Sequence, residues 1–185
     1  MRYVLAIDPG NNESGIALLN SDYRPVFKAK LDNHEILKAF TLQSIYTSEE
    51  PINPVLEYIQ KIDEVVIEMV SHYGSGMSAG KTVFDTCVWI GRFAEHFLLM
   101  GRSVTLMERR YVKLGLCGTS IAKDSNVTQA LIDRFAYGVR NHGKGKKKQQ
   151  GWFFGFKADI WQAYAIGVVY IDLIKAEDHK NMEVL

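Results

Sequence analysis

The stretch Tyr3–Gly15, YVLAIDPGNNESG, limits the possible folds of this chain more than any other segment. An apolar run rich in strand-forming residues stops at Asp8, Pro9-Gly10 turns the chain, and a second apolar run, Gly15–Leu19, follows at once. The two runs predict adjacent strands of a hairpin, with Asp8 at the carboxyl end of a buried strand. Taken alone, Asp8 has a second interpretation, because an Asp before Pro-Gly often does no more than start a turn.

Length and composition favour one globular domain spanning residues 1–185. The chain has 185 residues, of which 47% are hydrophobic and 23% charged, so it can bury a core and is not a disordered tail. The start, MRYVLAID, lacks a leader-like apolar stretch, and no run approaches membrane-spanning length. Cys87 and Cys117 show neither a pairing pattern nor metal-ligand spacing, which favours small structural thiols. We therefore expect a reduced, cytoplasmic protein without a membrane partner.

Charge is sorted along the chain. Residues 1–108 carry 9 Lys/Arg against 14 Asp/Glu, a net of −5. Residues 109–157 carry 11 against 2, a net of +9, and residues 158–185 carry 2 against 5, a net of −3. An evenly mixed surface would not be divided in this way, so the middle segment is predicted to face a polyanion.

Strand and helix patterns alternate along the rest of the chain, which predicts an α/β fold. The first hairpin is followed by a third strand, so three consecutive strands are expected to be antiparallel. The remaining elements are expected in this order: strand 24–30, helix 33–46, short helix 54–61, strand 64–69, Gly/Ser loop 74–80, long helix 80–100, strand 103–107, a loose basic stretch, helix 125–139, an exposed low-complexity segment 141–151, and a last helix from about 158 to 176.

The long helix has more apolar residues than one core face needs. We expect that core face to consist of Val83, Cys87, Ile90, Ala94 and Phe97. Val88, Trp89 and Phe93 are predicted to lie beyond it, and Gly91 would let a partner approach closely. The sequence therefore predicts a homodimer whose interface includes this helix.

Three acidic residues are placed where they could converge at one edge of a sheet. Asp8 and Glu68 end predicted strands, and Asp159 opens the last helix. Each has a simpler interpretation: Glu68 as a solvated strand end, Asp159 as a complement to the helix dipole. Next to a segment of net charge +9, the three together predict a divalent metal site acting on a nucleic acid. Hard oxygen ligands suit Mg²⁺ or Mn²⁺, and up to two ions per subunit could flank a phosphodiester.

Four segments of the chain have to be considered together: LAIDPGNNESGIAL, VVIEMVSHYGSGMSAGKTVFDTCVWIGRFAEHF, RYVKLGLCGTSIAKDSNVTQALI and KADIWQAYAIGVVYID. In combination they resemble the RuvC-type Holliday junction resolvases of the ribonuclease H-like superfamily. Within that family the chain looks most similar to the RuvC-like endonucleases of lactococcal phages. The resemblance implies an α/β, ribonuclease H-like fold: a mixed five-stranded sheet, three antiparallel strands first, flanked by helices.

The resemblance also implies an activity and its residues. A homodimer would nick branched DNA, four-way and possibly three-way junctions, by metal-dependent hydrolysis that leaves 5′-phosphate and 3′-hydroxyl ends. The family's three acids fall on Asp8, Glu68 and Asp159, and its basic residues near the cleaved phosphate fall on Lys113 and Lys123. Such an enzyme works in DNA recombination or in processing replicating DNA, in a bacterial cytoplasm if phage-encoded.

Two positions depart from the family pattern. A second acid is usual three residues into the last helix, whereas this chain has Gln162, whose amide oxygen can ligate a metal but brings no charge. The bulky residue that probes the junction centre is missing, because the nearest position is Ser71. His72 or Tyr73 could stack on DNA instead, although a tyrosine that packs on its own loop fits the sequence equally well.

The basic segment contains further candidates for DNA contact. Its exposed part offers phosphate-binding cations at Arg140, Lys144, Lys146, Lys147 and Lys148. The aromatic run Trp152-Phe153-Phe154 is better interpreted as packing before the last helix than as a base-stacking platform.

Two alternatives to the nuclease remain to be weighed. A non-catalytic protein that binds branched DNA is compatible with the neutral Gln162. An actin-like ATPase, suggested by Asp8-Pro9-Gly10 as a phosphate loop, needs two such domains and a far longer chain, and is set aside.

Overall fold

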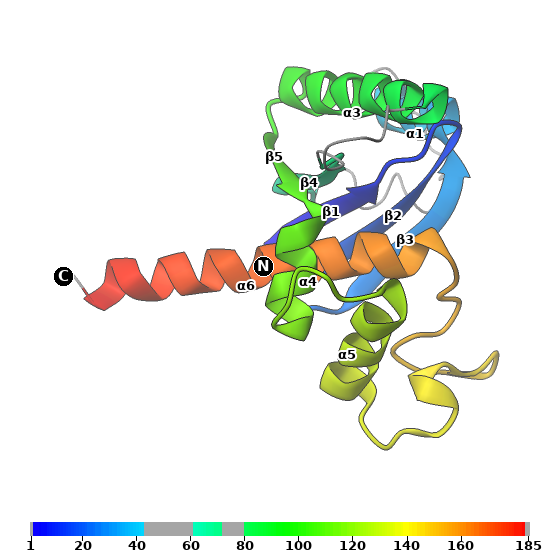
Figure 1. Ribbon diagram of the computed structural model, residues 1–185, viewed down its shortest axis with the longest axis vertical. Coiled ribbons are helices and arrows are strands. Elements are labelled where there is room, and N and C mark those ends of the chain that lie inside the picture. Colours follow the sequence, from blue (N-terminus) through cyan, green and yellow to red (C-terminus); the bar gives the residue numbers. More distant parts are fainter. Residues whose placement is uncertain (1, 43–60, 72–79, 184–185) are drawn as a thin grey trace.

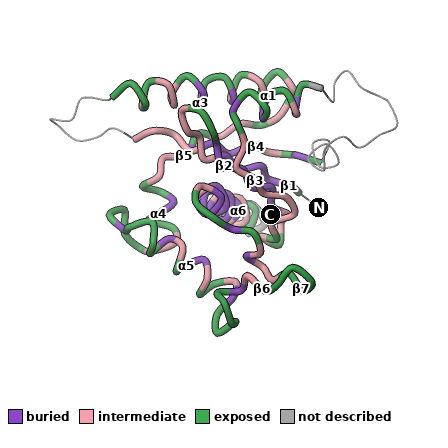
Figure 2. Tube along the Cα trace, turned by 90° about the vertical axis from the view of Figure 1, so that its right-hand side faces the viewer, coloured by how far each residue is buried: buried purple, intermediate pink, exposed green. Residues whose placement is uncertain are grey.

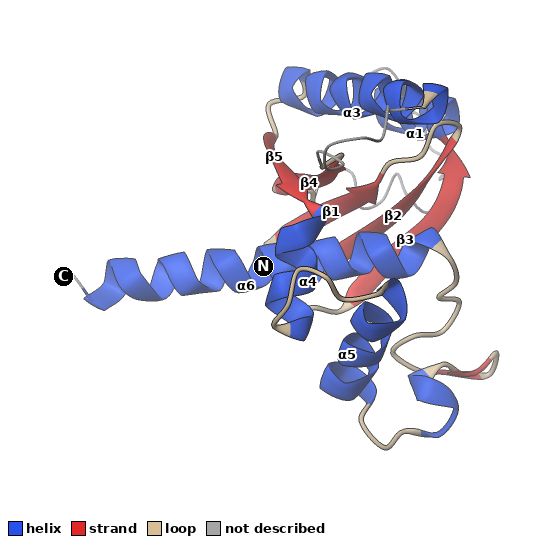
Figure 3. Cartoon of the chain, in the orientation of Figure 1, coloured by secondary structure: helices blue, strands red, loops and turns tan. Residues whose placement is uncertain are grey.

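The computed structural model describes residues 2–42, 61–71 and 80–183. At its centre lies a five-stranded sheet in the order β3-β2-β1-β4-β5 (Figures 1 and 3). Its strands are β1 Tyr3–Asp8, β2 Glu13–Asn20, β3 Pro25–Asp32, β4 Glu64–Met69 and β5 Ser103–Glu108. β1, β2 and β3 pair antiparallel, whereas β4 runs parallel to both β1 and β5. The predicted α/β class, with a mixed five-stranded sheet, is confirmed.

Helices cover both faces of this sheet (Figure 1). One face carries α1 Asn33–Leu42 and α3 Lys81–Leu99. The other carries α4 Arg109–Cys117, α5 Asp124–Ala136 and α6 Asp159–Glu183, and the carboxyl end of α6 extends beyond the sheet. Between α5 and α6 lie the 3₁₀ turn η1 Arg140–Gly143 and a small hairpin, β6 Gly145–Lys146 and β7 Gln149–Gln150. Among the described helices, none is both long and apolar enough to cross a membrane.

The two helical layers explain why the central strands are apolar almost without interruption. In β1, Leu5 and Ile7 belong to the core that α1 and α3 cover, whereas Val4 and Ala6 belong to the core under α6. Successive side chains of a strand point to opposite faces, so a strand buried on both sides needs apolar residues at every position. Figure 2 shows the result as buried strands with the buried part of α6 beside them. The polar residue that ends such a strand is therefore conspicuous.

The segment after β5 differs from the prediction of a loose stretch. It forms the helix α4, whose sequence RRYVKLGLC is rich in good helix formers and buries Val112. Gly118, at a φ of +70°, ends the helix in the left-handed conformation that glycine adopts without strain. The helix could not be recognised from the sequence, because its buried side is narrow and basic residues interrupt the apolar pattern.

The predicted faces of α3 were partly wrong. Trp89 and Phe93, expected beyond the core face, are 8% and 0% exposed and pack in the core with Ile90 and Phe97. The buried side is rotated relative to the prediction, so that Val83, Cys87 and Ala94 are only half-buried. Val88 is exposed, as predicted. Residues 54–60 of the predicted short helix and 74–79 of the predicted loop lie outside the described residues.

Candidate active site

The first acid, Asp8, lies at the carboxyl end of β1, and the pairing of this strand sets its neighbours. Asp8 is opposite Gly15 in β2. A Cβ atom at Gly15 would lie 2.4 Å from the backbone oxygen of Asp159, so only glycine lets the start of α6 approach β2 this closely. The chain enters α6 through Ala158, at a φ of +38°. Asp8 and Asp159 are thus brought to the same edge of the sheet.

Glu68 reaches this edge through the parallel pairing of β1 and β4. Ile7 pairs with Ile67, so Asp8 and Glu68 are the next residues along two neighbouring parallel strands. Ala6 and Val66, two residues earlier, both face the core under α6. Because side chains alternate along a strand, Asp8 and Glu68 project toward the same face, where α6 begins. The three predicted carboxylates therefore share one edge and one face of the sheet.

Burial and like charges raise the pKa values of two of these acids. The pKa of Asp8 lies well above its usual value, first because of burial and then because of Glu68, and Asp159 and Asp124 add to the rise. Arg109 opposes that rise. Burial also raises the pKa of Glu68, against the opposing effect of Arg109. Clustered carboxylates in a site of this kind need a positive charge to stay ionised.

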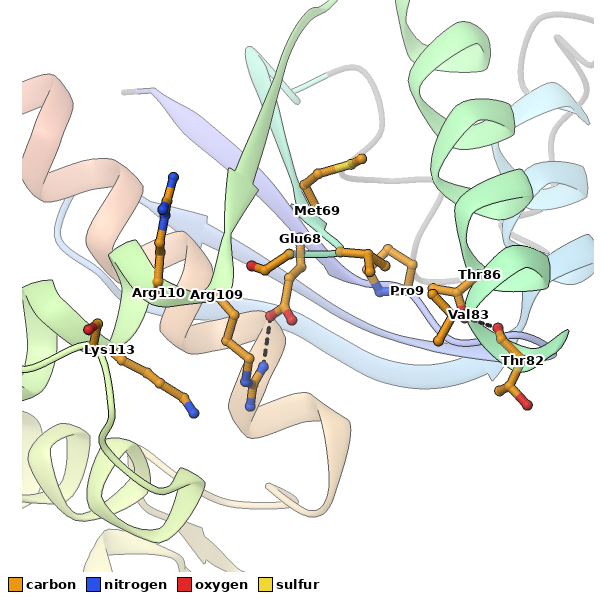
Figure 4. A pocket seen from close by; sticks show the side chains of 12 residues that line it. Pro9, Glu68, Met69, Thr82, Val83, Thr86, Arg109, Arg110 and Lys113 are labelled. Carbon is orange, nitrogen blue, oxygen red and sulfur yellow. Dashed lines mark hydrogen bonds and ion pairs between the residues drawn. The ribbon is translucent and has the colours of Figure 1, made fainter. Parts of the chain in front are cut away.

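Arg109, which the sequence analysis did not single out, supplies part of that charge. It follows β5 directly and begins α4. Its Nη1 donates to Glu68 Oε2 at 2.7 Å, while its Nη2 lies 2.6 Å from Gln162 Oε1 and 2.9 Å from Asp124 Oδ1. Figure 4 shows the guanidinium turned toward Glu68 and the neighbouring Arg110 turned away. The sequence did contain a signal for Arg109. Because β5 runs parallel to β4 and β1, the residue that follows β5 lies at the same edge of the sheet as Asp8 and Glu68.

A second cation, Lys30 of β3, lies on the other side of the carboxylates. Its Nζ is 2.8 Å from Asp159 Oδ2 and 3.4 Å from Glu13 Oε2. Lys30 pairs with Gly15 in the β2–β3 register, which explains how a residue on the edge strand reaches the start of α6. The sequence analysis missed Lys30 because no local sequence pattern indicates that it pairs with Gly15.

The loop after Asp8 is fixed by buried polar side chains. Ser14 and Asn33 are both 0% exposed, and the Ser14 hydroxyl donates to Asn33 Oδ1 at 2.6 Å. Asn33 Nδ2 donates in turn to the carbonyl of Gly10 at 2.9 Å. The Gly10 amide donates to Ser14 Oγ at 3.3 Å, which closes the network. These bonds hold the Pro-Gly turn, and with it the end of β1, in one conformation.

The donor set suits a divalent cation, although it is not arranged as a finished metal cage. Oxygen ligands from Asp8, Glu68 and Asp159 are the kind that Mg²⁺ and Mn²⁺ prefer. The raised pKa values of Asp8 and Glu68 also indicate that a nearby positive charge would stabilise their ionised forms. Within residues 2–42, 61–71 and 80–183, however, no three His, Cys, Asp or Glu side chains are grouped closely enough to hold an ion. Instead, Arg109 pairs with Glu68 and Lys30 pairs with Asp159.

A cleft of about 420 Å³ opens beside Glu68. One wall is the start of α3, with Thr82 and Thr86, and the other is α4, with Lys113 (Figure 4). Lys113 Nζ lies 3.7 Å from Asp124 Oδ1, which places this predicted basic residue near the acids. The cleft thus combines hydroxyl and cationic groups next to a carboxylate, a setting that suits a phosphate backbone.

Within the described part of the chain, the other predicted basic residues form no ion pair with Asp8, Glu68 or Asp159. Lys123 is exposed at the N-cap of α5, next to Asp124. Arg140 lies in η1, and the four lysines lie on or beside the exposed β6–β7 hairpin: Lys144, Lys146, Lys147 and Lys148. Tyr73 and His72 lie outside the described residues. Trp152 stacks on Phe135 with ring centroids 5.1 Å apart and Phe153 is buried, which agrees with a packing role for that aromatic run.

Comparison with known proteins gives a fold relationship. No family model matches the chain, and no curated protein matches it. Among solved structures, 28 chains match. One is RuvC of Thermus thermophilus, with a TM-score of 0.58 and 15% identity over 90% of this chain and 92% of that one. Another is T. thermophilus RuvC in complex with Holliday junction substrate, with a TM-score of 0.60 and 15% identity over 91% of this chain and 92% of that one. The chain therefore has the fold of RuvC.

Proposed function

We propose that this chain is a divalent-metal-dependent endonuclease that cleaves branched DNA, in particular four-way Holliday junctions. The observation that carries the proposal is the convergence of Asp8, Glu68 and Asp159 at one edge of a RuvC-like sheet, beside a cleft that contains Lys113. One of the similar structures is RuvC in complex with Holliday junction substrate, which supports junction DNA as the substrate. A closer relationship to the endonucleases of lactococcal phages stays a prediction.

The chemistry proposed is hydrolysis of a phosphodiester. A water oxygen forms a bond to phosphorus, the bond from phosphorus to the 3′-oxygen breaks, and the departing oxygen takes a proton. The products are a 5′-phosphate and a 3′-hydroxyl. A bound Mg²⁺ or Mn²⁺ would activate water and stabilise the charge that develops on the phosphate.

The residues of the candidate active site would have different roles in this hydrolysis. Asp8, Glu68 and Asp159 would hold the cation, and the fixed turn after β1 keeps Asp8 in place for it. Lys113, on the cleft wall, would orient the phosphate. Gln162 was predicted as a further ligand, but its amide oxygen accepts a hydrogen bond from Arg109.

The net charge of +9 between residues 109 and 157 supports a wide DNA-binding surface beyond the cleft. The basic hairpin, defined as residues 140–151, is exposed except at Gly143, Lys144 and Gly151, and would contact backbone phosphates. Lys123 and Tyr73 are further proposed DNA contacts. Backbone contacts position a duplex without reading its sequence, so they fit recognition of DNA shape.

Exposed apolar residues on α3 support a homodimer. Phe84, Val88 and Leu99 are 62%, 60% and 79% exposed, more than an isolated surface helix needs. A Cβ atom at Gly91 would meet no other atom within 4 Å, so the helix surface is open there. A twofold dimer would place two sites on one junction and allow paired nicks.

The proposal is tested by incubating the protein with Mg²⁺ or Mn²⁺ and a labelled four-way junction, with linear duplex as competitor. Cleavage of the junction is expected. Glu68→Gln and Asp159→Asn should each lower the rate at least about 100-fold while junction affinity is kept. Asp172→Asn is a matched control, because Asp172 lies on α6 and pairs with Arg134 away from the site.

The same assay separates the alternative. Binding of the junction without cleavage, under every metal condition, would favour a non-catalytic protein that binds branched DNA. Equal affinity for junction and linear duplex would contradict both.

A further inference from the structure

The guanidinium of Arg109 holds together three groups from different parts of the chain. It contacts Glu68 of β4, Asp124 of α5 and Gln162 of α6, at 2.7, 2.9 and 2.6 Å. Its side chain is only 25% exposed, so the contacts are partly shielded from water. Planar guanidinium groups suit this multiple pairing better than an ammonium group does.

Gln162 gains a specific role from this contact. It lies three residues after Asp159 and therefore on the same face of α6. A carboxylate at this position would add a full negative charge next to Asp159 and favour a second cation. The neutral amide instead presents its oxygen to Arg109, a fixed cation that the chain itself supplies.

We propose that Arg109 takes the place of a second metal ion, so that each subunit binds a single divalent cation. The inference rests on the proposed function and concerns the metal content of that site. Asp8 and Asp159 would hold the ion, and Glu68 would be shared between the ion and Arg109. Arg109 is a positioning residue here: it acts through the carboxylates that it holds.

The pairing of residues 109 and 162 makes the proposal testable without DNA. If Gln162 ligated a second ion directly, Gln162→Asp alone would strengthen the binding of that ion. If Arg109 replaces the ion, the carboxylate introduced by Gln162→Asp pairs with Arg109, and no second ion binds until Arg109 is removed as well. The number of bound ions therefore distinguishes the two cases.

The experiment counts Mn²⁺ ions bound per chain by electron paramagnetic resonance of the free ion, in the absence of DNA. Wild type and Gln162→Asp should each bind one ion, and Arg109→Met combined with Gln162→Asp should bind two. Arg110→Met combined with Gln162→Asp is the matched control and should bind one, because Arg110 pairs with Glu108 and points away from Glu68 (Figure 4).

Two ions bound to wild type or to Gln162→Asp alone, or one ion bound to the Arg109→Met double variant, would overturn the proposal. Circular dichroism checks folding, and Arg109→Gln with Gln162→Asp answers the same question if the Met variant does not fold. Junction cleavage by wild type is measured in parallel. One bound ion without cleavage contradicts the proposed function alone, whereas two bound ions with cleavage contradict only the role of Arg109.

Discussion

Replacing Asp8 by Asn should make the protein more stable in the absence of metal while abolishing cleavage. Burial and the neighbouring acids Glu68, Asp159 and Asp124 raise the pKa of Asp8, against the opposing effect of Arg109. An acid whose pKa is raised by folding stabilises the protein below its unfolded pKa, and this contribution is lost as the pH rises through the folded pKa. At pH 7, well above the usual pKa of an aspartate, the raised pKa of Asp8 is therefore a cost to the folded state that the neutral, isosteric Asn removes.

The gain has two sources: the burial of Asp8, which is the larger cause of its raised pKa, and the like charges around it. Three carboxylates raise its pKa and one guanidinium lowers it, so the like charges are in excess. Two like charges about 4 Å apart cost about 4 kcal/mol at an effective dielectric constant of 20, and this cost falls in inverse proportion to their separation. Solvent reduces this, because the Asp159 and Asp124 side chains are 39% and 58% exposed. We expect a net gain of about 1–2 kcal/mol, or about 2–8 °C in Tm for a chain of this length.

Thermal unfolding in EDTA at pH 7 and at pH 4 measures the effect. The Tm of Asp8→Asn should exceed that of wild type at pH 7, and the difference should shrink toward pH 4, near the usual pKa of 3.8. Added Mg²⁺ should also shrink it, because a cation that binds the folded state stabilises wild type. An Asp8→Asn variant no more stable than wild type at pH 7 in EDTA would refute this reasoning.

Asp172→Asn is the control of opposite sign. Burial would raise the pKa of Asp172, but hydrogen bonds from Arg134 and Tyr23 outweigh burial and lower it. Its contribution is present above the unfolded pKa and is lost as the pH falls through the folded pKa. Asp172→Asn should therefore lower Tm at pH 7. The loss in the free energy of unfolding should be no more than about 1 kcal/mol, because the Arg134–Asp172 pair is partly exposed.

Three further variants test other parts of the molecule. Asn33→Ala should lower the free energy of unfolding by about 2–4 kcal/mol in urea titrations, since it leaves the proton of the buried Ser14 hydroxyl without its acceptor and the Gly10 carbonyl without the side-chain amide that donates to it; a loss below about 1 kcal/mol would show that water replaces the Asn33 amide. Val88→Glu should convert the dimer to a monomer in light scattering, and a monomeric wild type would rule out the α3 interface. Neutralising the basic hairpin should weaken junction and duplex binding alike and flatten their salt dependence, whereas unchanged affinity at low salt would remove the hairpin from the DNA surface; the residues to change are Lys144, Lys146, Lys147 and Lys148.

Local sequence patterns were sufficient for the strands and for the positions of the three predicted acids, whereas the mixed five-stranded sheet was predicted from the family resemblance. The apolar runs of β1, β2 and β4 are buried on both faces, so their composition signals a strand without knowledge of its partners. A charged residue that ends such a run must lie at the sheet edge, which is why Asp8 and Glu68 could be placed from the sequence. The start of α6 at Asp159 was also visible, since an acid at a helix start fits the helix dipole.

The helix faces depended on tertiary packing. The apolar residues of α3 are numerous enough to permit several core faces, and the sequence alone favoured one that omitted Trp89 and Phe93. Contact with the sheet and α1 selected the face that buries both. In α4, few residues are buried. The helical periodicity of its apolar residues was therefore too weak to be recognised among the basic residues.

The cations of the site were decided by tertiary structure alone. Arg109 contacts Glu68 across 41 positions and Gln162 across 53 positions of sequence, and Lys30 reaches Asp159 from the edge strand β3. A periodic pattern carries information over a few residues, whereas an ion pair depends on which strands become neighbours. The sequence thus determined where the acids lie, and the strand order together with the close approach of α6 at Gly15 determined which positive charges face them.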